Sequence, residues 1–202
     1  MYKFRSGFTL AEVMIAVAIV GIIAVLTIPS FIKGYNQRAN FTKLLKMHHD
    51  LEQNLEVLRT QNIYGDYLNS SLYTDNETKL KDFFNKNYKV KSTVSSDECS
   101  SEFDFSCDYA VRLKDNSVIA IKKFGSGSAA NSYSSVYIDV NGYEPPNQNC
   151  EDRYQFNIYK KYEIDVINPY STSYTPNLRV ANTLHERLRC VGEYINNGWK
   201  RE

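Results

Sequence analysis

The stretch that decides the fold reads SGFTLAEVMIAVAIVGIIAVLTIPSF and covers residues 6–31. From Val13 to Phe31 no side chain carries a charge. At a rise of about 1.5 Å per residue, a helix over this run is about 28 Å long, close to the hydrocarbon thickness of a bilayer. One acid, Glu12, stands at the start of the run, and Lys3 and Arg5 precede it. The pattern predicts a membrane-spanning helix whose basic N-terminal end faces the cytoplasm.

Three ordinary explanations of this stretch compete. A secretory signal peptide needs a small-residue cleavage site after its apolar core, and residues 27–33 (TIPSFIK) offer none. A plain signal anchor explains the basic residues and the length, but not an acid in lipid. Thr9 and Glu12 also have the T-x-x-E spacing of a helix capping box, in which the acid bonds back to the amide of Thr9. A capping box accounts for the acid locally, but leaves it in a costly environment.

The start of the chain resembles the class III signal of type IV pilins and pseudopilins. A short basic leader, residues 1–7, ends in Gly7, and Phe8, Glu12 and an apolar helix follow. The resemblance implies that a membrane aspartic peptidase cuts between Gly7 and Phe8 and that Phe8 is N-methylated. It also implies that Glu12 pairs with the new amine of Phe8 in a neighbouring subunit. Because an unpaired acid in lipid costs several kcal/mol, this pairing favours subunits that are in register.

The helix is expected to continue beyond the apolar run with one apolar face. Pro29 should kink it, because proline lacks the backbone N–H, and the resemblance implies partial melting there during assembly. From residue 40 onward apolar residues recur at spacings of three and four, which predicts a face packed on a head domain. These residues are Phe41, Leu44, Leu45, Leu51, Leu55 and Leu58. The predicted divisions are a leader (1–7), a membrane and filament-core half (8–31), a half packed on the head (32–61) and the head itself (62–202).

The head is predicted to contain a small antiparallel sheet. Residues 62–106 are polar and loop-rich, with one helix expected over 78–87. Strands are predicted over 107–114, 117–124, 132–140 and 155–159, with a hairpin turn at 115–116. A short strand over 163–167 and a helix over 182–195 complete the prediction. The fold class is α+β and similar to that of type IV pilins: a long N-terminal helix packed on an antiparallel sheet of three to four strands.

Four cysteines, at positions 99, 107, 150 and 190, lie beyond the apolar run. An even number on the outer side of a membrane favours two disulfides, and four cysteines allow three pairings. Of these we favour Cys99–Cys107, which closes a short loop, and Cys150–Cys190, which ties a loop to the C-terminal region. A zinc site is the alternative, but no C-x₂-C motif or histidine cluster supports it. The histidines are expected on solvated helix faces: His48, His49 and His185.

One segment of the head contains oxygen donors of the kind that calcium prefers. They are Asp139, Asn141, the carbonyl of Tyr143, and Asp152. An EF-hand is rejected, because its twelfth position would be Cys150 rather than Glu. The segment resembles a loop of pseudopilin-like proteins, some of which hold calcium there, although Glu151 stands where those proteins commonly have Gly. The alternative, which we favour, is a polar turn stapled by Cys150. No other cofactor is expected.

Charge and motifs exclude several functions. The net charge is +1, and loss of Lys3 and Arg5 leaves 22 basic against 23 acidic residues, a net charge of −1. Neither value predicts nucleic-acid binding through bulk charge. No Ser/His/Asp order, Cys/His pair or metal motif has a supporting context, so we expect no enzyme. A membrane-anchored enzyme has no positive feature in its favour.

The resemblance implies a structural subunit of a type IV pilus or a type II secretion pseudopilus. Its implied partners are other pilin or pseudopilin subunits, the prepilin peptidase and an inner-membrane assembly platform. The implied location is the bacterial inner membrane, single-pass with a cytoplasmic N-terminus, and then a periplasmic or extracellular filament. The alternative is a minor tip pilin that binds DNA or a surface, with Lys122-Lys123 and Lys160-Lys161 as its best basic candidates.

Overall fold

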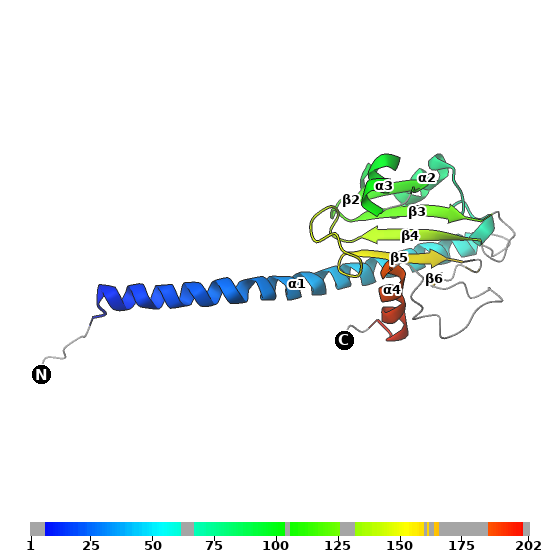
Figure 1. The fold of residues 1–202 in the computed structure, drawn as a ribbon. Coiled ribbons are helices and arrows are strands. Elements are labelled where there is room, and N and C mark those ends of the chain that lie inside the picture. Colours follow the sequence, from blue (N-terminus) through cyan, green and yellow to red (C-terminus); the bar gives the residue numbers. More distant parts are fainter. Residues whose placement is uncertain are drawn as a thin grey trace, which may run out of the picture. The chain divides into compact units, whose positions relative to one another are not determined.

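The computed structural model describes residues 7–61, 67–103, 106–125, 132–159, 161, 164–165 and 186–199. The chain divides into two compact units, Met1–Ala39 and Asn40–Glu202, and each is described by itself. The described elements are a long helix α1, a 3₁₀ turn η1 (Tyr67–Asn69), three further helices and a six-stranded sheet (Figure 1). The fold class is α+β, as predicted.

Helix α1 runs from Leu10 to Gln61, a length of 52 residues, which confirms its predicted C-terminal end. Pro29 lies inside the helix. Two hydroxyl groups bond backbone carbonyls next to the proline: Thr27 Oγ1 donates to the Ile23 carbonyl (2.9 Å) and Ser30 Oγ donates to that of Thr27 (3.0 Å). The helix continues past the proline to Gln61, and the kink and melting expected there stay predictions.

The part of α1 in the second unit buries one stripe of side chains. The buried residues are Asn40, Leu44, Met47, His48, Leu51 and Leu55. Leu44, Leu51 and Leu55 were predicted in this stripe. Leu45 was predicted as well, but it is 38% exposed. On a helix of about 3.6 residues per turn, consecutive side chains point about 100° apart, and Leu45 lies on the side of Leu44 that faces away from the core.

The sheet has six antiparallel strands in sequence order, β1-β2-β3-β4-β5-β6. The strands are β1 (Val90–Thr93), β2 (Tyr109–Leu113), β3 (Val118–Phe124), β4 (Tyr133–Asp139), β5 (Arg153–Ile158) and β6 (Ile164–Asp165). The expectation of three to four strands is therefore wrong. It missed β1 because this edge strand, VKST, has a single apolar residue and is largely exposed, so no alternating pattern marks it. The predicted turn at 115–116 does join β2 to β3.

A core lies on each face of the sheet. On one face α1 and α2 (Glu77–Asn87) pack on the central strands. On the other face α3 (Ser96–Phe103), a helix that the sequence analysis did not predict, covers a smaller cluster. Successive side chains of β4 point to opposite faces of the sheet and so contribute to both cores. Val136 and Ile138 belong to the first cluster and Tyr137 to the second.

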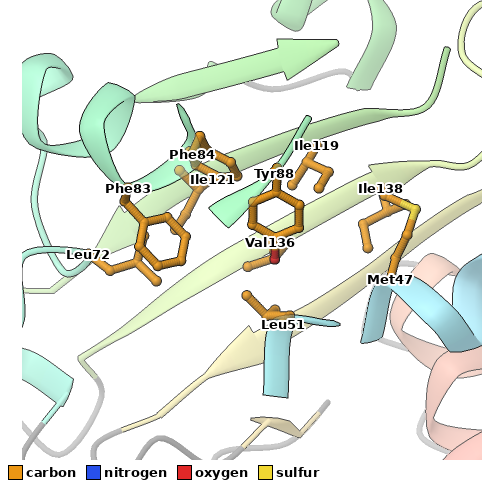
Figure 2. Close-up of a pocket in the computed structure, with 10 residues that line it drawn as sticks. All are labelled: Met47, Leu51, Leu72, Phe83, Phe84, Tyr88, Ile119, Ile121, Val136 and Ile138. Carbon is orange, nitrogen blue, oxygen red and sulfur yellow. The ribbon is translucent and has the colours of Figure 1, made fainter. Parts of the chain in front are cut away.

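The larger core is closely packed between α1 and the sheet. Figure 2 shows Met47 and Leu51 of α1 across a small void from Ile119, Val136 and Ile138 of the strands. The void measures about 10 Å³, and its walls are almost wholly apolar. A space of that size and polarity holds at most one water molecule and is expected to stay dry. This interior is therefore a structural core and not a ligand site.

The C-terminal helix α4 (Glu186–Asn196) contacts β5, and part of its predicted range, 182–185, lies outside the described residues. His48 of α1 is buried between Phe156 (5.7 Å between ring centres) and Trp199 (4.4 Å). The expectation of a solvated His48 is therefore wrong, because the ring lies in the buried stripe of α1. Burial and the charge of His49 lower the pKa of His48 to about 4. The ring is thus uncharged at neutral pH, which suits its aromatic surroundings.

Candidate functional site

The start of α1 contains the predicted capping box. Glu12 Oε2 accepts hydrogen bonds from the amide of Thr9 (2.8 Å) and from its hydroxyl (2.8 Å). The amide of Glu12 donates to Thr9 Oγ1 at 3.3 Å. Among the described residues, no hydrogen bond reaches the other oxygen, Oε1. The single chain therefore uses one carboxylate oxygen as a helix cap and leaves the other available to a partner.

Gly7 and Phe8 precede the helix and are exposed, with Phe8 87% exposed. A Cβ atom added at Gly7 would meet nothing within 4 Å. A larger residue at this position therefore does not clash with the chain itself. A requirement for glycine here must come from an outside partner that approaches the backbone closely, as a peptidase does.

The first unit exposes a long apolar surface. Among the described residues, α1 is the one helix long and apolar enough to cross a membrane. Its large apolar side chains from Val13 (48% exposed) to Phe31 (77% exposed) are uncovered within the described part of the chain. A continuous apolar surface of this length needs lipid or other helices around it.

The structure pairs Cys99 with Cys107 and Cys150 with Cys190, the two pairings that the sequence analysis favoured. The first bridge joins α3 to the segment before β2. The second joins the loop before β5 to α4, across a sequence separation of 40 residues. A closed loop of that length restricts the unfolded chain by about 4 kcal/mol in the chain-entropy account. The second bridge is therefore the main covalent support of the C-terminal helix.

Asp152 organises the loop that joins β4 to β5. Its side chain is fully buried, and its two oxygens accept hydrogen bonds from the backbone amides of Gln148 (2.7 Å) and Asn147 (2.8 Å). Gly142 has a positive φ of 73°, and a Cβ there would lie 2.4 Å from the carbonyl oxygen of Asn116. The loop thus has the sharp turn for which glycine was expected, and a carboxylate holds it in shape.

Asp139 lies at the other end of this loop and is also fully buried. Its Oδ1 accepts from the amide of Asn141 (3.2 Å), and its Oδ2 lies 3.3 Å from Nε of Arg153. Burial and the charge of Asp152 nevertheless raise the pKa of Asp139 to about 7. Burial also raises the pKa of Asp152. One arginine therefore compensates the two buried carboxylates only in part.

Two side-chain oxygens in the same loop are buried without a hydrogen-bond partner: Oδ1 of Asn141 and Oδ1 of Asn147. Their amide nitrogens are engaged, since Asn141 Nδ2 donates to the carbonyl of Glu144 (2.9 Å) and Asn147 Nδ2 to that of Tyr143 (3.3 Å). Asn147 was not in the predicted calcium set. Its only sequence signal was its place in the same Asp-, Asn- and Pro-rich segment.

The loop is compatible with calcium and is also complete as a turn without it. Asp139, Asp152 and the carbonyl of Tyr143 already accept hydrogen bonds. Across the described ranges there is no group of three His, Cys, Asp or Glu side chains placed to hold a metal ion. Two buried carboxylates beside two unpartnered amide oxygens are, however, an oxygen-rich set of the kind that calcium takes.

The basic residues considered for DNA binding are engaged within the head. Nζ of Lys123 lies 3.2 Å from Oδ2 of Asp75. Nζ of Lys122 bonds the hydroxyl of Ser106. Lys160 lies outside the described residues. Of Lys122 and Lys123, Lys123 is in an ion pair and Lys122 is hydrogen-bonded to a neutral hydroxyl group.

A family model described as the prokaryotic N-terminal methylation motif matches residues 2–28. No curated protein and no solved structure matches the chain. The matched range includes Gly7, Phe8 and Glu12 and no part of the head. The chain therefore carries the prepilin signal of type IV pilins and pseudopilins. This signal is typical of structural subunits of the pilin type.

Proposed function

We propose that this chain is a structural subunit that is cleaved after Gly7, methylated on the new amine of Phe8, and polymerised through its N-terminal helix. The product is a type IV pilus or a type II secretion pseudopilus. The observation that carries this proposal is the methylation motif at the start of an exposed apolar helix that contains one acid, Glu12. The disulfide-bonded head supplies the outer part of such a subunit.

The apolar side chains and the acid have different parts in assembly. In lipid, apolar contact alone does not drive helices together, because lipid tails are as apolar as the side chains. The run from Val13 to Phe31 is therefore accommodated both in a bilayer and among other helices. Glu12 is poorly accommodated in a bilayer, because a charged acid within a membrane helix costs about 3 kcal/mol on insertion scales. Its unused Oε1 gains a charge-assisted hydrogen bond if a neighbour places its Phe8 amine there, and only one axial register does so.

The partners follow from this role. The prepilin peptidase cuts the leader on the cytoplasmic side, an inner-membrane platform supports assembly, and other pilin or pseudopilin subunits form the filament. The unassembled chain spans the inner membrane once with its N-terminus in the cytoplasm. Binding of DNA or a surface at a filament tip stays the alternative, and the ion pair of Lys123 with Asp75 does not favour it.

Gly7→Val is expected to leave the head folded and to abolish cleavage. The structure has open space around the Cβ position of Gly7, so the loss must arise in the peptidase and not in the chain. Mass spectrometry of the membrane-extracted wild-type protein should show a mature N-terminus at a singly methylated Phe8. The Gly7→Val protein should keep all of residues 1–7.

The matched control is Gly34→Val, since a Cβ at Gly34 also meets nothing within 4 Å. This variant should be processed as the wild type is. A wild-type protein that still begins at Met1 when the peptidase is present would overturn the proposal. If the mature protein is absent from sheared surface material, a surface pilus is excluded and the pseudopilus remains as the proposed filament.

We also propose that the loop over residues 139–152 binds calcium. The support is the pair of unpartnered oxygens, on Asn141 and Asn147, beside the carboxylates of Asp139 and Asp152. An ion there would neutralise charge that Arg153 offsets only in part.

Asn141→Asp tests the calcium site, because it adds one more carboxylate without changing the size of the side chain. In EDTA this variant should melt below the wild type, since three acids then repel one another. Calcium should raise the melting temperature of both proteins and should raise that of the variant more. At 100 times the dissociation constant, a single site adds about 2.7 kcal/mol to the free energy of unfolding. If neither melting temperature responds to calcium, the loop is a turn and not a metal site.

A further inference from the structure

A groove of about 370 Å³ lies in the head, and its lining residues include none from the calcium loop. Four lysines line it. Lys43 and Lys46 come from α1, Lys89 from the connection between α2 and β1, and Lys114 from the turn between β2 and β3. Its volume is at the lower end of the range for small-molecule sites, which is about 300–1,000 Å³.

The fold itself brings these lysines together. Lys43 and Lys46 are one helical turn apart and therefore share a face of α1. The backbone amide of Lys114 donates to the carbonyl of Lys89 at 2.9 Å, which fixes the second pair. Nζ of Lys43 donates to the carbonyl of Val140 at 3.1 Å, which fixes this ammonium beside the first residues of the calcium loop.

The charge of the groove is not balanced by its acids. Asp50 and Asp115 are the two acids among its lining residues, so four lysines leave a net charge of +2. The carboxylate of Asp115 is already bound to the amide and hydroxyl of Ser117. In the part of the chain that the structure describes, Lys46, Lys89 and Lys114 form no ion pair. Cations held close together in this way attract an anion.

The floor of the groove is apolar and firmly held. Met47 and Leu113 line it and are themselves buried in the core. Tyr88 lines it as well, and burial, together with the charge of Asp50, raises the pKa of Tyr88 to about 12. Its phenol is therefore uncharged at neutral pH. Met47 and Tyr88 also line the small void of the core and are labelled in Figure 2.

We propose that this groove binds a phosphate monoester of a small organic group. A phosphate monoester has a charge between about −1.5 and −2 at neutral pH, which matches the net charge of the groove. Lysine ammonium groups act on phosphate as point charges and do not require the planar geometry that arginine imposes. The volume beyond the phosphate lies over the apolar floor and takes the body of the ligand. The phosphate could belong to a soluble molecule or to the headgroup of an anionic lipid.

The test uses the full chain in a neutral detergent with glycerol 3-phosphate as the probe, followed by isothermal titration calorimetry. Wild type should bind in a saturable way. Lys46→Gln and Lys114→Gln should each weaken binding at least about tenfold, because each removes a charge-assisted contact from one side of the groove. The control is Lys81→Gln, an exposed lysine of α2 outside the groove, which should bind as the wild type does.

Short-chain lipids distinguish the two sources of phosphate. Dihexanoyl phosphatidic acid is added as a competitor of the probe. If it displaces the probe at a lower concentration than unlabelled glycerol 3-phosphate does, the ligand is a lipid headgroup whose acyl chains lie on the apolar floor. Equal or weaker displacement indicates a soluble phosphate ester. Dihexanoyl phosphatidylcholine should not compete. Absence of saturable binding, or equal weakening in the Lys81→Gln control, would overturn the proposal and would leave the filament role untouched, because that role does not depend on this groove.

Discussion

Glu12→Ala is expected to abolish filament assembly while the chain stays processed, folded and membrane-bound. The substitution removes the carboxylate that would pair with the Phe8 amine of a neighbour, so nothing then selects one axial register over another. It leaves Gly7, Phe8 and the apolar run intact, and residues 40–202 form a compact unit of their own. The measurement is the amount of mature protein in sheared or affinity-isolated filaments, compared with the amount in membranes.

Glu12→Gln separates pairing from capping. The amide oxygen of glutamine can still accept the hydrogen bonds that Glu12 Oε2 receives from Thr9 (2.8 Å each), but it carries no charge. If the acid acts across subunits, Glu12→Gln should fail to assemble as Glu12→Ala does. If the acid acts only as a helix cap, Glu12→Gln should assemble normally. Normal assembly of the glutamine variant would therefore contradict the role that we assign to this residue.

Leu44→Ala is expected to lower the free energy of unfolding of the head by about 3 kcal/mol. Leu44 is 0% exposed and lies in the main core, between α1 and the sheet. Removing its branched end leaves a cavity that the close-packed neighbours cannot fill. The neighbouring Leu45 is 38% exposed, so Leu45→Ala should cost less than about 1 kcal/mol. The two variants match in position, helix propensity and chemical change.

Fluorescence of the single tryptophan, Trp199, follows this unfolding, because its ring lies against the buried His48. The full chain should be unfolded with urea in a fixed concentration of neutral detergent. The midpoint of Leu44→Ala should fall well below that of Leu45→Ala, with the slope unchanged. Equal midpoints would mean that the α1 stripe does not pack on the sheet as described.

Much of the fold follows from local patterns in the sequence. The three- and four-residue spacing of leucines predicts the second half of α1, and strand-forming segments on either side of turn residues predict β2, β3 and β4 within a residue or two of their bounds. The pattern failed where few apolar residues mark an element. Strand β1 is held by its backbone bonds to β2, and α3 contains the disulfide-bonded Cys99 and a buried Phe103. Such elements depend on neighbours distant in sequence, which periodicity does not report.

The two candidate sites differ in how far the sequence foretold them. Gly7, Phe8 and Glu12 lie close together in the sequence and inside the matched methylation motif, so the sequence alone identifies them. In the calcium loop, Asn147 entered the candidate set only through the structure, which shows its side-chain oxygen buried without a partner. Burial and hydrogen-bond satisfaction are properties of the folded chain.

The sequence alone determined that the chain begins with a prepilin signal and an apolar helix of membrane length, because both are contiguous patterns that need no tertiary contact to be read. Only the tertiary structure decided that His48 belongs to the buried face of α1, that Asn141 and Asn147 have buried oxygens without a partner, and that Lys46 and Lys114 line one groove. Each of these depends on side chains that are far apart in the sequence and brought together by the pairing of strands and the packing of α1 on the sheet.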